Sequence, residues 1–149
     1  MSASIANHTA YKQVDIQTAS QGKLIVMLFN GAIQRAEEAK RQLEKSRREG
    51  AHKNLVRAQE IIGELRGALN MKAGGIADSL DKLYEYFQHL LIRANIRKDV
   101  RPIDECVQLM ASMRDTWQEL FEKAAKDENP QKPPPEINQH GSAVINVQG

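Results

Sequence analysis

Apolar residues recur every three or four positions through four stretches of the chain, and short polar or glycine-containing segments separate these stretches. Such spacing places the apolar residues on one face of an α-helix. The stretches predict helices over about 20–48, 51–69 and 76–97, and a fourth helix that begins at Pro102. Because short turns favour antiparallel neighbours, the pattern predicts an all-α fold, an antiparallel up-down four-helix bundle over residues 18–126.

The first predicted helix contains the most apolar segment of the chain. Residues 24–29 read Leu-Ile-Val-Met-Leu-Phe, and so short a run does not by itself distinguish a strand from a helix. Residues 24–33 would cover nearly the whole circumference of a helix, so we expect neighbours or a partner on almost every side. A helix is favoured because the stripe of Leu24 and Leu28 continues at helical spacing through Ala32, Ala36, Ala39 and Leu43.

Local signals predict where the helices begin and end. Thr18 and Gln21 fit a capping box, which places the first turn near 19–22. Gly50 fits the residue that commonly follows a helix, so the first helix is expected to stop before it. Asn70 and the Gly74-Gly75 pair predict the turn before the third helix.

The second helix has two glycines outside its apolar face. Gly63 and Gly67 lie one turn apart, beside Val56, and a glycine inside a helix costs about 1 kcal/mol relative to alanine. Two explanations stay open, neutral variation on an exposed surface and a shallow groove wall that lets another helix approach closely. The predicted core face of the second helix consists of Leu55, Ala58, Ile61, Ile62, Leu65, Ala68 and Leu69. That of the third helix consists of Ile76, Leu80, Leu83, Tyr84, Phe87, Leu90, Leu91 and Ala94. That of the fourth helix consists of Ile103, Cys106, Val107, Met110, Met113, Trp117, Leu120, Phe121 and Ala124.

Both ends of the chain differ from the helical part. Residues 1–17 form a predicted flexible N-terminal arm, in which Tyr11, Val14 and Ile16 are apolar residues able to dock on the bundle. Residues 127–149 combine proline, asparagine and glutamine without a helical period, which predicts a disordered tail.

Composition excludes several classes of protein. The net charge is only +2, so no whole-molecule field attracts nucleic acid or membrane. No apolar run approaches the ~20 residues of a membrane span, and the N-terminus lacks the pattern of a signal peptide. The single cysteine, Cys106, rules out an internal disulfide and suits a reducing compartment. We therefore expect a cytoplasmic protein.

The chemistry of an enzyme is also missing from the pattern. A di-iron bundle requires a Glu-x-x-His pair on each of two helices. Only one of the four histidines, His52, has a glutamate, Glu49, three residues before it. Glu85 and His89 are four apart on a solvated face, and Cys106 lies within an apolar stripe, where an inert thiol is expected. No phosphate-binding, dinucleotide or nucleophile motif occurs. The sequence thus predicts no catalytic residue, no cofactor and no metal site.

Nucleic-acid binding is a weak alternative. Basic residues concentrate in 40–53, where we expect a solvated helix end and turn. Proteins that bind single strands combine such charge with exposed aromatic rings. Here Tyr84, Phe87 and Trp117 belong to the predicted core faces, so the two ingredients are separated. From the residues alone, a peptide-binding groove, a central core helix and a homodimer interface all explain the surplus apolar surface of the first helix equally well.

Several motifs resemble one known family. Thr18-Ala19-Ser20-x-Gly22-Lys23 followed by LIVMLFNGA, preceded by Tyr11-Lys12-Gln13-Val14, is similar to the FliS family of flagellar export chaperones. The resemblance spans roughly residues 10–120, and Gln21 stands where the family often has proline. Later matches occur in the same order, at Leu83-Tyr84-Glu85-Tyr86, Ala94-Asn95 and Arg114-Asp115-Thr116-Trp117.

The resemblance implies a function and a partner. FliS-like chaperones are four-helix bundles that hold the C-terminal segment of flagellin, keep it unpolymerised in the cytoplasm and support its type III export. An export-gate protein, a flagellar regulator and a second copy of the chain are further candidate partners. A homodimeric adaptor and a weak nucleic-acid binder are the alternative functions. The candidate client-binding residues are Tyr11, Val14, Ile16, Leu24, Ile25, Leu28, Val56, Gly63 and Gly67.

Overall fold

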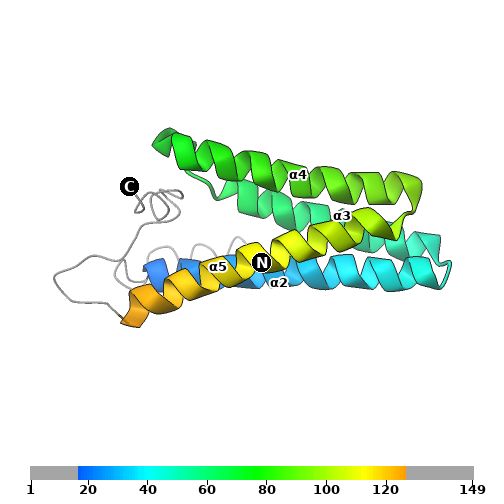
Figure 1. The fold of residues 1–149 in the computed structure, drawn as a ribbon, viewed down its shortest axis with the longest axis horizontal. Helices are drawn as coiled ribbons and strands as arrows, with labels where there is room; N and C mark the ends of the chain where they lie inside the picture. The colour runs from blue at the N-terminus through cyan, green and yellow to red at the C-terminus, as the bar shows by residue number, and fades with distance from the viewer. Residues whose placement is uncertain (1–16, 127–149) are drawn as a thin grey trace, which may run out of the picture.

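The computed structural model describes residues 17–126, and these residues form four long helices and one short one (Figure 1). The predicted arm and tail lie outside the described residues, apart from Gln17. The elements are α2 (Gln17–Glu44), α3 (Arg48–Gly67), the 3₁₀ helix η1 (Met71–Ala73), α4 (Gly75–Arg97) and α5 (Val100–Lys126).

The helices form an antiparallel bundle, as predicted. Helix α2 packs against α3 and α5, and α4 packs against the same two helices. Consecutive helices run in opposite directions, so the start of α2 lies with the end of α5 at one end of the bundle (Figure 1). The end of α4 lies at the opposite end, beside the turn to α5 (Figure 1).

The core contains the apolar faces that the sequence predicts. Every predicted core residue of α3 and α4 is buried or partly buried. The rings of Phe29, Tyr84 and Phe87 meet in the interior, with centroids 5.8 Å apart for the first pair and 6.0 Å for the second. The Phe29–Tyr84 contact is edge-to-face, and such a contact adds to the free energy of burying the rings.

The turn between α2 and α3 differs from the prediction. The first helix ends at Glu44 and not at about residue 48, and Gly50, predicted to follow it, lies inside α3. Ser46 takes the left-handed conformation with φ 59°. Its amide donates to Leu43 O at 2.9 Å, and the next amide donates to Gln42 O at 2.8 Å. These two bonds are those of a Schellman motif, which a serine here forms in place of the usual glycine.

The other helix ends agree better with the sequence. The side chain of Asn70 accepts a hydrogen bond from the Lys72 amide at 3.1 Å, and Gly74 has a positive φ of 73°. Helix α5 begins at Val100, two residues before the predicted Pro102, and the Asp99 carboxylate accepts from the Arg101 amide at 3.0 Å. Helix α2 already includes Gln17, so its start precedes the predicted first turn.

Polar contacts also join neighbouring helices, and those of two seams matter here. Between α3 and α4, Arg66 donates to both carboxylate oxygens of Asp81, at 2.8 and 3.0 Å, and to Gln88 Oε1 at 2.9 Å. Between α2 and α5, Arg114 Nη1 donates to Asn30 Oδ1 at 2.9 Å. Such contacts fix the lengthwise register of helices whose apolar faces are otherwise similar.

Candidate functional site

The apolar run at the start of α2 divides between the core and the surface. Ile25 is 8% exposed and Phe29 is completely buried. Leu24 is 52% exposed and Met27 65% exposed, while Leu28 is partly buried. A large apolar side chain left open to water forgoes much of the roughly 1.5–3 kcal/mol that full burial contributes. The bundle thus leaves one side of this helix uncovered, as the sequence pattern implied.

The opposite side of the same helix is closed by aromatic rings of α5. Trp117 and Phe121 stack with centroids 5.5 Å apart and planes inclined by 14°. The Phe121 ring lies so close to Gly22 that a Cβ there would be 2.6 Å from Cγ of the ring. Glycine at this position therefore allows the two helices to approach, and α5 anchors the start of α2.

Beneath this contact lie two buried polar groups of aromatic residues. Burial raises the pKa of the Tyr84 hydroxyl to about 12, so the phenol stays neutral. Trp117 Nε1 is buried and has no hydrogen-bond partner within residues 17–126. The aromatic cluster on this side of α2 is therefore buried and uncharged.

The candidate residues of α3 lie on a different side of that helix from α2. A Cβ at Gly31 would be 3.5 Å from Ile61, so the stripe that contains Leu24 and Leu28 faces α3. A Cβ at Gly63 would instead be 3.5 Å from Gln88 of α4. Gly67 has no atom within 4 Å of such a Cβ.

A charged ridge on α3 separates these two strips. Arg57 pairs with Glu60 at 3.2 Å and with Glu64 at 3.8 Å, and all three side chains are exposed. The structure therefore brings Leu24, Ile25 and Leu28 together, and it places Val56, Gly63 and Gly67 across the ridge from them. Tyr11, Val14 and Ile16 lie outside the described residues.

Several exposed apolar residues are absent from the predicted client-binding residues, among them Met27, Ile92 and Ile96. Met27 belongs to the apolar run of residues 24–29, and its side chain is more exposed than that of Leu24. Ile92 and Ile96 are 42% and 77% exposed near the end of α4. Both fall outside the predicted core face of their helix and lie one turn apart, which was the available signal.

The groups that enzymes and metal proteins use are not assembled in the described part of the chain. Within residues 17–126, no three His, Cys, Asp or Glu side chains gather as metal ligands would. Cys106 is buried and its Sγ donates to Phe87 O at 3.6 Å. Burial raises the pKa of this thiol to about 12, which fits the predicted inert thiol. None of the described helices has the length and apolar character needed to span a membrane.

Fold and surface together define a class of protein. A helical bundle with an uncovered apolar helix face offers a partner helix a surface of the kind used in helix-in-groove recognition. The class is that of a protein-binding bundle, and comparison with known proteins gives the family.

The family model described as "Flagellar protein FliS" matches residues 3–124. The flagellar secretion chaperone FliS of Bacillus subtilis is 32% identical over 120 residues, 80% of this chain and 90% of the relative. That of Salmonella typhimurium is 33% identical over 126 residues, covering 80% and 93%. That of Vibrio cholerae is 30% identical over 116 residues, covering 74% and 85%. The chain belongs to the FliS family of flagellar secretion chaperones, which is a family of chaperones rather than of enzymes.

Proposed function

We propose that this protein is an export chaperone for flagellin, which binds the C-terminal segment of flagellin in the cytoplasm, prevents its premature polymerisation and supports its type III export. The observation that carries the proposal is the pair of exposed side chains at the start of α2, Leu24 at 52% and Met27 at 65%. Membership of a flagellar secretion chaperone family supports it. The site offers an apolar surface and no reactive group, so the proposed action is binding without catalysis.

The client contacts follow from the exposure of each residue. Leu24, Met27 and the accessible part of Leu28 would receive the apolar face of a client helix. Ile25 is too buried to touch the client, so its role is to hold the helix surface from beneath. A flagellin terminus that is disordered as a monomer would become helical on this surface, which lowers the affinity by the cost of ordering.

A long client would also cross α3. Val56, Gly63 and Gly67 lie beyond the ridge of Arg57, Glu60 and Glu64, and the missing side chain at Gly67 leaves open space there. We assign this strip to a second segment of the same client. Gly67→Leu would then weaken client binding without disturbing the bundle, because no atom lies within 4 Å of a Cβ at this position.

The N-terminal arm supplies the remaining candidate residues. Tyr11, Val14 and Ile16 are apolar and precede α2 in the chain, so they are close in sequence to the exposed surface. We assign them to a cover that lies over this surface and repacks against the bound client. Tyr11→Ala would then weaken client binding and increase the binding of an apolar dye to the free protein.

The experiment is a calorimetric titration of the full chain with a flagellin C-terminal segment. Leu24→Asp combined with Met27→Asp should weaken binding at least about tenfold, because two apolar contacts are lost and two carboxylates lose water. The control, Gln34→Asp with Gln108→Asp, adds the same charge at exposed positions and should leave the affinity unchanged. Undetectable binding by the unmodified chain would refute the function, and equal affinity of the unmodified and Leu24/Met27 variants would refute the site.

A further inference from the structure

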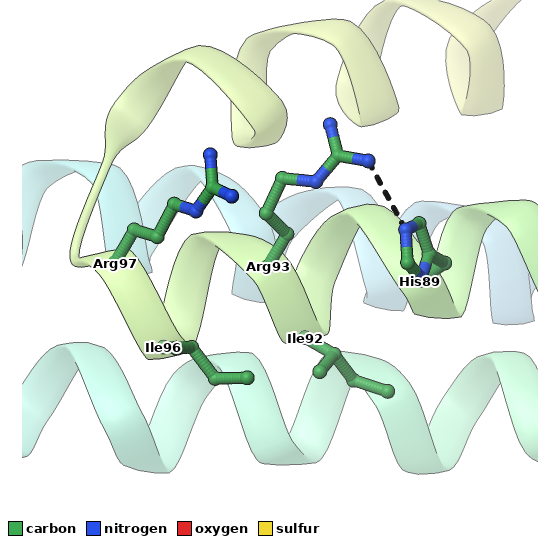
Figure 2. A pocket seen from close by; sticks show the side chains of 5 residues that line it. All are labelled: His89, Ile92, Arg93, Ile96 and Arg97. Carbon is green, nitrogen blue, oxygen red and sulfur yellow. Dashed lines mark hydrogen bonds between the residues drawn. The ribbon is translucent and has the colours of Figure 1, made fainter.

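A second exposed apolar surface lies at the other end of the bundle from the start of α2. Ile92 and Ile96 are 42% and 77% exposed, one turn apart on α4. Together with His89, Arg93 and Arg97 they line an open hollow of about 300 Å³ (Figure 2). This volume is at the lower limit of small-molecule sites, which are usually enclosed. An open hollow on one helix instead suits side chains of a protein partner.

The side chains of this surface are arranged in two parallel rows. Figure 2 shows Ile92 and Ile96 projecting on one side of α4 and Arg93 and Arg97 on the other, with His89 between the viewer and the helix. Each row has a spacing of four residues, so its members stand one above the other along the helix. An apolar row thus runs alongside a cationic row.

The cationic row is only partly balanced by its neighbours, because the pKa of the nearby Asp99 carboxyl is lowered chiefly by Arg101 and to a smaller extent by Arg97. Arg93 contacts His89 at 3.1 Å, and neither Arg93 nor Arg97 forms an ion pair with a carboxylate of residues 17–126. Four carboxylates at this end of the bundle have other partners. Asp99 pairs with Arg101, Glu105 accepts from Tyr86, Asp104 pairs with Lys40, and Glu49 pairs with Lys53.

We propose that Ile92, Ile96, Arg93 and Arg97 form a docking surface for an acidic amphipathic helix of a partner protein. Such a helix would place two apolar residues, one turn apart, on the isoleucines and carboxylates on the guanidinium groups. Arginine suits this role because its planar group binds a carboxylate through two hydrogen bonds. The surface is at the other end of the bundle from Leu24 and Met27, so a partner can dock while a client helix occupies those two residues.

Charge also decides against a second copy of the chain as the occupant. A symmetric dimer through this surface is isologous, so each copy presents the same patch to the other. The two pairs of arginines would then lie close together and repel each other. Complementary charge, by contrast, attracts an acidic helix and makes the surface specific for such a partner.

The test uses synthetic helical peptides as probes of the full-length protein. The acidic probe carries two leucines four positions apart with glutamates beside them, and the basic probe has lysines in place of the glutamates. Fluorescence anisotropy should show tighter binding of the acidic probe, by about threefold to tenfold for two exposed charge pairs. The difference should shrink as salt screens these charges.

Variants of the surface give the decisive comparison. Arg93→Glu with Arg97→Glu should reverse the preference between the two probes, and Ile92→Ala with Ile96→Ala should weaken both probes. The matched control, Lys72→Glu with Lys82→Glu, makes the same change in net charge at exposed positions near the start of α4. It should leave both affinities unchanged.

Four results would overturn the proposal. The first is equal binding of the acidic and basic probes by the unmodified protein. The second is loss of probe binding in the variant with Leu24→Asp and Met27→Asp, which would place the probe on the client site. The third is tighter probe binding on Val144→Asp with Ile145→Asp, which would make the chain's own tail the occupant. A dimer abolished by Ile96→Asp would be the fourth, assigning the surface to a second copy. Because the client titration uses other residues, failure here leaves the proposed function untouched.

Discussion

The start of α2 and the end of α4 expose similar apolar side chains in different surroundings. Leu24 and Met27 lie on a helix whose other side holds Ile25 and Phe29 in the core. Ile92 and Ile96 lie beside Arg93 and Arg97. The first surface is backed by the buried core, and the second has a cationic border. Exposed apolar area therefore indicates where a partner binds, and the charges around that area indicate what kind of partner binds there.

The two regions also differ in how they are joined to the bundle. The start of α2 is closely packed, because Phe121 of α5 lies on the bare backbone of Gly22. At the end of α4, by contrast, Ile96 is 77% exposed. Changes at the first region should therefore alter the stability of the fold, whereas changes at the second should mainly alter binding.

The largest effect is expected from one substitution made in both regions. Ile25 is 8% exposed and Ile96 is 77% exposed. Ile25→Ala should lower the free energy of unfolding by about 2–5 kcal/mol, because it leaves a cavity in the core. Ile96→Ala should change it by less than about 0.5 kcal/mol. Urea denaturation of both variants measures the difference, and similar losses would show that the two isoleucines are packed alike.

The next largest effect is expected from two helical glycines. Gly22→Ala would put a Cβ 2.6 Å from Phe121, and because that ring is stacked on Trp117 the cost should be about 1–3 kcal/mol. Gly67→Ala meets no atom within 4 Å and should stabilise the protein by about 0.4–1 kcal/mol through a less flexible unfolded chain. Thermal melts should thus shift in opposite directions. A gain in stability at Gly22 would contradict the close packing of α2 on α5.

Much of the fold could be predicted, because helical spacing of apolar residues records which face each helix buries. The turn after α2 could not. Glycine at position 50 is the expected signal, but Ser46 adopts the left-handed conformation and the two Schellman bonds form there. Gly50 has another role, since a Cβ at this position would be 2.5 Å from Oε1 of Gln42. A close contact between side chain and backbone leaves no local pattern in the sequence.

The candidate site was predicted only in part for a related reason. An unbroken apolar run shows that surface is in surplus, but it does not show which members are covered. The position of α5, through Phe121 and Gly22, decides that Ile25 is buried and Leu24 exposed. The sequence shows Ile96 as an apolar residue outside the predicted core face. The kind of partner it would bind depends on Arg93 and Arg97, which form no ion pair in the described part of the chain.

The smallest effect concerns the polar seams that hold these regions in register. Arg66 binds Asp81 through two hydrogen bonds, at 2.8 and 3.0 Å, and they hold the pKa of the Asp81 carboxyl below its usual value. A carboxyl whose pKa is lower in the folded state stabilises the fold at a pH above its unfolded pKa, about 3.9. That contribution is lost as the pH falls through the lower folded value.

Asp81→Asn should therefore cost about 1 kcal/mol near neutral pH, as expected for a partly exposed pair with good geometry. The difference from the unmodified protein should shrink when unfolding is measured near pH 3. The α2–α5 seam provides the contrast, because Asn30 accepts from Arg114 at 2.9 Å through an amide that does not titrate. The cost of Asn30→Ala should be similar at both pH values. If the cost of Asp81→Asn were also independent of pH, the ion pair would not hold α4 against α3, and packing alone would set the position of the arginine-bordered surface.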